Sequence, residues 1–257
     1  MTALFRYGWA FFAIGGVWQA LSLLLGEFVL PRPFMVLAAF SEAVCDTGFL
    51  AHAGESAWRV CTGLCLAWAF GFPMGILLGC RRKLDAMMAP IVFLTYPVPK
   101  IVFLPVFFSL FGLGDLPRSV LIALTVGYQI LVVTRASVLN LDPKYLDSFL
   151  SLGGSRKDLM RHVLIPAALP DAVTALRVAS GTAVAVLFMA ESFATRKGLG
   201  FLIMDAWGRG DQIEMFTGIM AMSLVGLCLY GLSNLLERFL CPWKSHPAEN
   251  DLVFKES

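Results

Sequence analysis

Ionisable residues inside long apolar stretches are the first places where this 257-residue sequence could do chemistry. Lys100, Arg135, Arg177 and Glu191 each lie within such a stretch or close to its edge. A charged side chain at the centre of a membrane span costs on the order of 2.5–3.5 kcal/mol on insertion scales, so it usually pairs with another group or lines a polar path. A cation on such a path would attract a sulfonate, a nitrate or a carboxylate.

The position of each residue within its stretch suggests a different role. Lys100 either faces the pathway or extends along the helix to the cytoplasmic membrane surface. Arg177 lies about two turns into its stretch, where a neighbouring carboxylate or backbone carbonyls could pair with it. Glu191 lies near the outer end, where it is better placed as a gate or partner contact than as a proton carrier, and Arg135 is most simply an interfacial anchor. The candidate substrate-pathway residues are therefore Lys100, Arg177 and Glu191.

Catalytic and metal-binding patterns are not recognisable in the sequence. There is no Ser/His/Asp set, carboxylate pair or metal-ligand cluster, and no G-x-x-x-x-G-K-[ST] phosphate loop. His52, His162 and His246 lie in predicted loops, where we expect them to be solvated surface groups. The six cysteines are scattered without C-x-x-C spacing, which is typical of apolar packing residues. We expect no catalytic residue, no metal and no cofactor. Because the phosphate loop is missing, any ATP hydrolysis that serves this protein is expected to take place on a separate polypeptide.

The composition predicts the elements that position these residues. Hydrophobic residues make up 58% and charged residues 15% of the chain, against about 45–50% and about 25% in soluble domains. A spanning helix needs about 20 mostly apolar residues, and qualifying stretches lie at about 8–25, 60–80, 90–113, 119–139, 168–192 and 215–237. The predicted fold class is an all-α, polytopic integral membrane protein with about six transmembrane helices. The net charge of +2 gives little support for a nucleic-acid partner.

The third predicted span differs from the others because it contains Pro90, Pro97, Pro99 and Pro105. Each proline removes a backbone donor and bends a helix, and broken backbone at membrane depth must be covered by protein or a water-filled cavity. We expect 90–113 to be broken or partly re-entrant and to line the interior or a subunit contact; a kinked packing helix is the alternative. Segments 26–58 and 193–214 are too polar to cross lipid, although the first has room for a short surface helix.

Clusters of Lys and Arg predict the orientation. Basic residues at 81–83 and 144–161 follow the second and fourth spans, and such loops are usually cytoplasmic. With six spans, both termini then also face the cytoplasm. The expected organisation is an N-terminal span and periplasmic segment at 1–56, a membrane core at 57–240 and a cytoplasmic tail at 241–257.

The loop between the fourth and fifth spans carries strong helix signals. Asp142 can cap a helix that has Pro143 at its first position and runs to about Leu152. Gly153 and Gly154 then supply a stop and a sharp turn.

A second short helix is expected after this turn. Ser155 can cap it, Asp158 completes a variant of the capping box, and Pro166 is expected to end it. The two helices present an apolar knob beside basic residues; its members are Phe149, Leu150, Leu152, Leu159, Met160, Arg156, Lys157 and Arg161. Such a knob suits docking into a groove of another protein. An amphipathic helix on anionic headgroups is the alternative, and a DNA-binding helix-turn-helix is disfavoured by tethering between two spans.

This loop resembles the cytoplasmic signature of the inner-membrane permeases of binding-protein-dependent ABC importers. That signature is Glu-Ala-Ala, three residues, Gly, nine residues and Ile-x-Leu-Pro. The corresponding residues are Asp147-Ser148-Phe149, Gly153 and Val163-Leu164-Ile165-Pro166. The first triplet is degenerate, and Phe149 is the change in size. Segments 96–115 and 176–192, followed by Gly198-Leu199-Gly200, look like the nitrate/sulfonate/taurine branch, so the resemblance covers about 57–240.

The resemblance implies a permease that works as a homodimer in the bacterial inner membrane. Each copy's cytoplasmic coupling helix would sit in a cleft of one subunit of an ATP-binding dimer, and a periplasmic binding protein would deliver the substrate. The implied ATPase-coupling residues are Asp147, Ser148, Phe149, Gly153, Arg156, Val163, Ile165 and Pro166.

The substrate is expected to be a small solute, an anion such as nitrate, a sulfonate or taurine; a heterocyclic vitamin precursor is the alternative. An ion-coupled secondary transporter is the rival from another class, but it should show matched broken helices in two halves. Only one strongly broken segment is evident here. A polytopic membrane enzyme would need a catalytic set on the loops.

Overall fold

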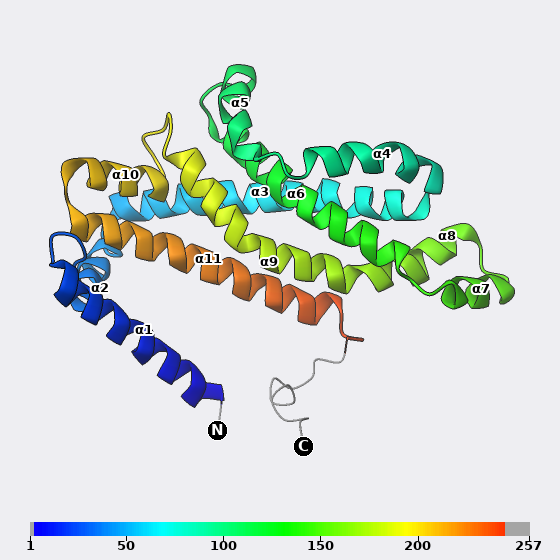
Figure 1. The fold of residues 1–257 in the computed structure, drawn as a ribbon, viewed down its shortest axis with the longest axis horizontal. Coiled ribbons are helices and arrows are strands. Elements are labelled where there is room, and N and C mark those ends of the chain that lie inside the picture. Colours follow the sequence, from blue (N-terminus) through cyan, green and yellow to red (C-terminus); the bar gives the residue numbers. More distant parts are fainter. Residues whose placement is uncertain (1–2, 245–257) are drawn as a thin grey trace. The chain divides into compact units, whose positions relative to one another are not determined.

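The computed structural model describes residues 3–244 of the chain, with the side chains of residues 8–244. Within this range every regular element is a helix (Figure 1), which confirms the predicted all-α class. Most of the predicted tail, including His246, lies outside the described residues.

Five helices of the described chain are long and apolar enough to cross a membrane, and a broken pair is a candidate sixth. The five are α1 (Ala3–Leu25), α3 (Thr47–Cys80), α6 (Asp115–Leu139), the continuous helix Arg156–Glu191 and α11 (Gln212–Leu240). The broken pair is α4 (Arg82–Thr95) with Lys100–Phe111, which comprises the 3₁₀ turn η1 (Lys100–Phe103) and α5 (Leu104–Phe111). The prediction of about six spans is confirmed when this pair counts as one.

The break in this pair confirms that the third predicted span is interrupted. Pro97 and Pro99 lie in the non-helical stretch 96–99 that follows α4, and Pro105 lies in the first turn of α5. Pro90 is different because it lies inside α4 without ending it. Because Pro90 does not interrupt α4, this helix begins at Arg82, earlier than the expected start of the third span at about residue 90.

The chain divides into two compact units. Unit 1 comprises Met1–Thr62, Phe103–Ser119 and Val184–Leu227, and unit 2 comprises Gly63–Val102, Val120–Ala183 and Cys228–Ser257. The long helices α3, α6, α9 (Ile165–Glu191) and α11 each contribute residues to both units.

Unit 1 contains two short helices in the segments that were expected to be polar connections. The first, α2 (Pro33–Ala43), agrees with the short surface helix expected in 26–58. The second, α10 (Leu199–Arg209), was not expected; it ends at Gly210, whose φ of 74° is left-handed. The expected lower boundary of the second span, residue 60, is also wrong, because α3 already begins at Thr47. Polar residues made this stretch look like a loop, but they are paired within the protein, as described below.

Unit 2 contains a close approach between α3 and α6. Gly71, Gly75 and Gly79 are spaced four residues apart and therefore lie on one face of α3. A Cβ atom at Gly75 would lie 2.6 Å from Cβ of Thr134, and one at Gly79 would lie 2.5 Å from Cβ of Val138. Small residues allow such close backbone contact in membrane helices. This packing depends on the absence of side chains on α3.

We expect Gly75→Val to destabilise the protein by about 1–3 kcal/mol more than Gly181→Val, since it forces new atoms into a filled interface. Gly181 is a matched control, because it also lies inside a long helix and a Cβ there would meet nothing within 4 Å. The measurement is the thermal unfolding midpoint of both purified variants in the same detergent. Equal midpoints would show that α3 and α6 do not pack through this face.

Candidate functional site

The loop between α6 and α9 forms the two short helices that the sequence predicts (Figure 1). The first, α7 (Pro143–Ser151), begins after Asp142, whose carboxylate accepts a hydrogen bond of 2.9 Å from the backbone N–H of Lys144. Its C-cap is Leu152. Both expected ends of this helix are confirmed.

The turn after α7 depends on two glycines. Gly153 has a φ of 83°, a left-handed conformation that glycine adopts without strain, and its N–H donates to the carbonyl of Leu150 at 3.0 Å. A Cβ atom at Gly154 would lie 2.1 Å from the ring of Phe149. Phe149, where the family signature has a small residue, therefore packs over the second glycine of the turn.

The second helix begins with the predicted capping box. Ser155 Oγ accepts from the N–H of Asp158 at 3.2 Å, and the Asp158 carboxylate accepts from the N–H of Ser155 at 3.3 Å. This helix, α8 (Arg156–Leu159), continues without interruption through a π-helical turn, η2 (Met160–Leu164), into α9.

The expectation that Pro166 ends this helix is wrong, because Pro166 lies inside the first turn of α9. Proline lacks an N–H and clashes with the carbonyl four residues earlier. The π-helical turn immediately before it changes that hydrogen-bonding pattern and lets the helix continue. The second short helix, the π-helical turn and α9 therefore form one continuous helix from Arg156 to Glu191.

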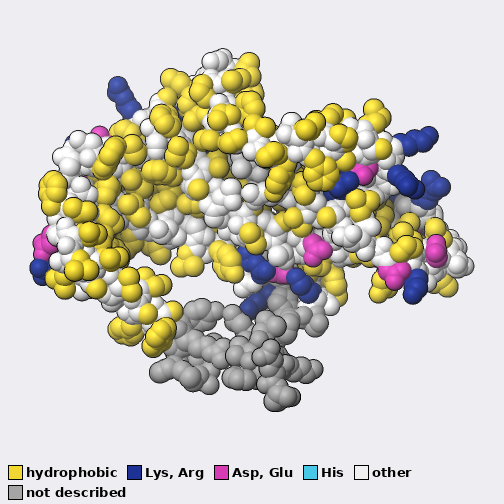
Figure 2. All heavy atoms as spheres, viewed as in Figure 1, with side chains coloured by type: hydrophobic (Ala, Val, Ile, Leu, Met, Phe, Trp, Pro, Cys, Tyr) yellow, Lys and Arg dark blue, Asp and Glu magenta, His cyan; other side chains and the backbone are white. Residues whose placement is uncertain are grey.

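We call residues 143–161, which comprise α7, the glycine turn, α8 and the first two residues of η2, the hairpin. A buried cluster in unit 2 holds it, formed by Ile76, Val138, Leu164 and Ala168 with Phe72, Cys80, Leu141, Leu146, Leu159 and Ile165 around them. Leu159, expected in the apolar knob, packs against this cluster. The exposed apolar residues are Leu152 (87%), Tyr145 (63%), Leu150 (45%) and Met160 (37%). Figure 2 shows charged side chains gathered beside α7 and α8, so the surface of the hairpin carries both apolar and charged side chains.

The predicted coupling residues occupy two environments around this hairpin. Asp147, Ser148, Gly153 and Arg156 are exposed, whereas Phe149, Val163, Ile165 and Pro166 are half-buried. The structure thus brings all eight into one region of unit 2. Their role in coupling stays a prediction.

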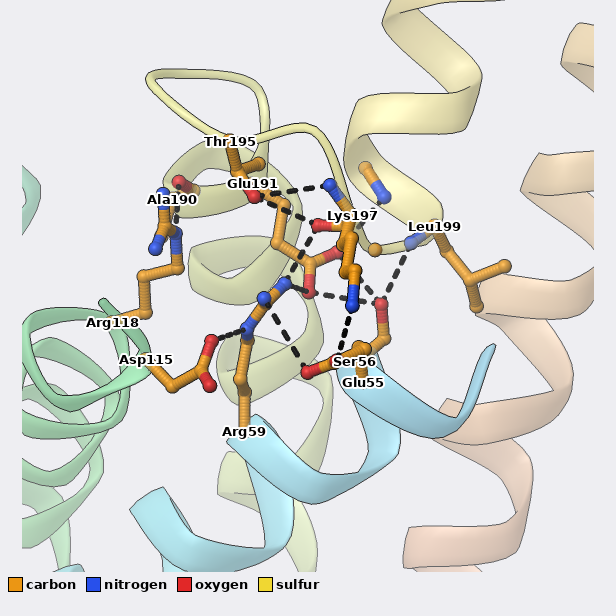
Figure 3. Close-up of polar contacts among 12 residues, drawn as sticks. Glu55, Ser56, Arg59, Asp115, Arg118, Ala190, Glu191, Thr195, Lys197 and Leu199 are labelled. Atoms are coloured by element: carbon orange, nitrogen blue, oxygen red, sulfur yellow. Dashed lines mark hydrogen bonds and ion pairs between the residues drawn. The ribbon is translucent and has the colours of Figure 1, made fainter. Parts of the chain in front are cut away.

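A second polar cluster lies in unit 1 around Glu191, the last residue of α9 (Figure 3). The Glu191 side chain is buried and accepts hydrogen bonds from Ser56 Oγ at 2.8 Å, Arg59 Nη1 at 2.8 Å and the N–H of Gly200 at 2.9 Å. Arg59 also donates to Asp115 at 2.6 Å. Glu191 is therefore the centre of a buried ion-pair network.

The position of the Glu191 side chain explains why two nearby residues are glycines. A Cβ atom at Gly198 would lie 2.4 Å from Cδ of Glu191, and one at Gly200 would lie 2.7 Å from its Cβ. Gly198 also has a φ of 118°. The Gly-Leu-Gly sequence is needed because Glu191 occupies the space beside it.

The histidine prediction needs correction. His52 lies on α3 and is half-buried; its Nδ1 accepts from the N–H of Gly198 at 3.0 Å, and its ring stacks on Phe201 with centroids 5.9 Å apart. It is therefore neither on a loop nor a solvated surface group. His162 is exposed, as expected, but it belongs to the π-helical turn.

The other candidate pathway residues lie in unit 2. Lys100 is 9% exposed; its Nζ donates to the carbonyls of Thr95 and Tyr96, each at 2.7 Å, and lies 4.5 Å from the ring centroid of Tyr128. The ammonium group thus binds the end of α4, a position that the sequence did not indicate.

Arg177 and Arg135 each pair with a carboxylate. Arg177 Nη1 lies 2.6 Å from Glu237, which agrees with the expectation of a neighbouring carboxylate. Arg135 Nη2 donates to Asp85 at 2.8 Å. Among the described residues no group of three or more His, Cys, Asp or Glu side chains is arranged to hold a metal ion.

Sequence reasoning missed Arg59, Ser56 and Arg118. Arg59 and Ser56 precede the expected span, and their shared partner Glu191 lies more than a hundred residues away. The signal that could have found them is the spacing of Glu55 and Arg59, four residues apart, at the start of an apolar run.

Comparison with known proteins identifies a family whose sequence pattern this chain matches. Residues 71–241 match the family described as "Binding-protein-dependent transport system inner membrane component". The chain is 29% identical over 232 residues to the taurine transport system permease protein TauC of Escherichia coli (strain K12), covering 88% of this chain and 84% of the relative. It is 28% identical over 247 residues to the putative aliphatic sulfonates transport permease protein SsuC of Bacillus subtilis (strain 168), covering 93% and 90%.

A solved structure shares the fold. A chain of the MetNI methionine ABC transporter in an inward facing conformation aligns with a TM-score of 0.64 and 19% identity, covering 74% of this chain and 95% of that chain. At this identity the likeness concerns the fold alone.

Proposed function

The chain belongs to the family of binding-protein-dependent transport system inner membrane components, and we propose that it forms the translocation pathway of an ATP-driven importer for a small anion. It is a multi-pass permease subunit without catalytic activity of its own, and ATP hydrolysis belongs to a separate subunit. The observation that carries the proposal is the hairpin, which has Asp147 and Gly153 at the spacing of the family's coupling signature. Between these two positions it presents Leu150 and Leu152 to solvent.

The hairpin is proposed to dock into a cleft of an ATP-binding subunit. A second copy of the chain would dock in the same way on the second ATP-binding subunit, so that ATP-driven closure moves the two hairpins together. Differential contacts with the closed and open ATPase would then bias the spans between two packings. The continuous helix from Arg156 to Glu191 supports this idea, because a displaced hairpin must displace the helix to which it is fused.

The proposed orientation places the hairpin and both termini in the cytoplasm. This orientation is supported by exposed basic residues of the hairpin, because basic loops prefer the cytoplasmic side of the membrane. These residues are Arg156, Lys157 and Arg161. The organisation into 1–56, 57–240 and 241–257 stays a prediction. In this orientation the loop at 192–198 and α10 face the periplasm.

The proposed substrate is a sulfonate or a similar small anion. The names of the two relatives mention taurine and aliphatic sulfonates. Lys100, Arg177 and Glu191 remain the proposed pathway residues, although Arg177 and Glu191 are already engaged in ion pairs. The Lys100 ammonium instead contacts neutral carbonyls, so we expect it to have the largest effect on anion uptake.

The test of this function is affinity purification in mild detergent, followed by reconstitution in liposomes with the co-purifying ATPase and the binding protein. We expect ATP-dependent uptake of a labelled alkanesulfonate. Accumulation of a vitamin-like heterocycle instead would retain the importer and change the substrate. A stable oligomer without an ATPase, active under an ion gradient, would contradict the importer.

We expect Lys100→Gln to raise the KM for an anionic substrate about tenfold, the effect of losing about 1.4 kcal/mol of binding free energy. The measurement is initial uptake against substrate concentration in the reconstituted system. Lys83→Gln, an exposed lysine on α4, is the control and should leave KM unchanged. Unchanged kinetics in Lys100→Gln would leave Lys100 as a support for the end of α4.

A further inference from the structure

We propose that the loop 192–198, through the exposed side chains of Arg196 and Lys197, is a docking surface for carboxylates on the substrate-binding protein. The inference rests on the proposed function and orientation. It concerns a surface that neither the hairpin nor the pathway residues explain.

Buried side chains from other elements hold the backbone of this loop (Figure 3). Arg118 is 1% exposed, and its guanidinium donates to the carbonyls of Phe193 at 3.3 Å and Ala194 at 2.8 Å. Arg59 donates to the carbonyl of Lys197 at 2.8 Å. Two buried arginines thus fix one short loop.

The loop's far end is held in the same way. His52 accepts from the N–H of Gly198, and Ser56 Oγ accepts from the N–H of Leu199 at 2.7 Å. A loop whose backbone is fixed along its length loses little conformational entropy when a partner binds. This arrangement is therefore suited to recognition.

Ala194 gives independent support. Among the described residues, Ala194 is the only non-glycine residue with a positive φ, which is 52°. Such a conformation is strained for a residue with a side chain and persists where surrounding contacts enforce it, as they do at many functional sites. Arg118 supplies such a contact through the Ala194 carbonyl.

The side chains that this loop presents are cationic. Arg196 is exposed, and within the described part of the chain its guanidinium makes no hydrogen bond or ion pair. Lys197 has a side chain that is 69% exposed, with its Nζ 3.6 Å from Glu55. In an exposed setting such a pair contributes little, so Lys197 can exchange Glu55 for another carboxylate.

These two residues rim an open cleft of about 570 Å³. Its charged lining comprises the four cations Arg59, Arg118, Arg196 and Lys197 and the two carboxylates Glu55 and Asp115. The lining therefore carries two more positive than negative charges, and Glu191, which pairs with Arg59, offsets one of them, so that an excess of one positive charge is left. Such an excess steers an acidic partner toward the cleft.

A protein surface fits this cleft better than the small anion itself. The guanidinium groups of Arg59 and Arg118 are already engaged by carboxylates and carbonyls, so the accessible donors are on the rim. A small anion needs convergent donors inside a pocket, whereas carboxylates projecting from a protein can reach two rim cations. Lipid headgroups adapt to any cationic surface and do not require a fixed loop.

The test reverses the charge of the rim with Arg196→Glu/Lys197→Glu in the full permease–ATPase complex, held in nanodiscs of zwitterionic lipid. We expect association with the substrate-binding protein to slow by about tenfold or more at low salt, and the salt dependence of this rate to diminish. ATP hydrolysis without the binding protein should be unchanged. Arg82→Glu/Lys83→Glu reverses another exposed, adjacent Arg–Lys pair and should not affect association.

Each contrary result has its own meaning. Unchanged association of the Arg196→Glu/Lys197→Glu complex would overturn this docking surface while leaving the importer intact. Equal slowing by both charge reversals would overturn it in favour of a general charge effect. If the reversal weakened only binding to anionic vesicles, the surface would be a lipid contact. Failure of the wild-type complex to respond to any binding protein would instead contradict the proposed function.

Discussion

Gly153→Pro is expected to release the ATP-binding subunit from the permease and to reduce ATP-driven uptake by more than about a hundredfold. Proline fixes φ near −65°, whereas Gly153 has a φ of 83° and donates its N–H to Leu150. The turn cannot form, so Leu150 and Leu152 lose their relative positions. Loss of about 3 kcal/mol of docking free energy, a usual size for a central contact, lowers affinity more than about a hundredfold.

Gly26→Pro provides the matched control. Gly26 has the same φ of 83° and also donates its N–H within a turn, to the carbonyl of Ser22. At Gly26, as at Gly153, an added Cβ atom would meet nothing within 4 Å. Both substitutions therefore disturb the backbone locally to a similar degree. The readout is the amount of ATPase that co-purifies with equal amounts of membrane-inserted permease. Normal transport by Gly153→Pro would contradict the coupling role.

Glu191→Ala is expected to destabilise the protein by about 3–5 kcal/mol, because it removes the fully buried carboxylate that pairs with the buried guanidinium of Arg59. Arg59 is 3% exposed, and Asp115 would remain as a partner whose side chain is 46% exposed. The removal also frees Ser56 and the N–H of Gly200 from their acceptor. Thermal unfolding in detergent should show the loss.

Two further variants make this result specific. Glu191→Gln keeps the shape of the side chain and one acceptor oxygen but replaces the other oxygen with an NH2 group and removes the charge, so its stability should lie between those of wild type and Glu191→Ala. Glu42→Ala removes an exposed carboxylate from α2 and should have little effect. If Glu191→Ala unfolded at the same temperature as Glu42→Ala, the buried network would not contribute to stability.

The hairpin was predictable because its determinants are local. Asp142, Ser155 and Asp158 cap helices within three residues of themselves, and Gly153 sets its own turn. The fold class was predictable for a different reason: long apolar runs need only length and composition to identify them. Neither inference requires knowledge of distant contacts.

The cluster in unit 1 could not be predicted in this way. Arg59 and Glu191 are 132 residues apart in sequence, and a charged residue looks solvated until its partner is known. For the same reason the first turns of α3 and the whole of α10 resembled polar connections. Long-range pairing overrode the local expectation.

Pro166 was misjudged because the π-helical turn before it leaves no simple mark in the sequence. A proline usually indicates the end of a helix, and the residues Met160–Leu164 carry no glycine or second proline that would suggest another arrangement. Local propensity identified the helix but not its wider turn.

The π-helical turn also makes the number of residues between hairpin and span a property under constraint. A π-turn accommodates an additional residue within an α-helix. Deleting one residue from Met160–Leu164 would remove the wide turn and leave α8 close to its present direction, whereas deleting one residue from the regular helix α9 would rotate α8 by about 100° about the helix axis, since each α-helical residue contributes that angle. In the second case the exposed leucines would point in a new direction while every one of them was retained. Deletions in α9 should therefore be tolerated less well than substitutions, because they change the angular phase of the hairpin.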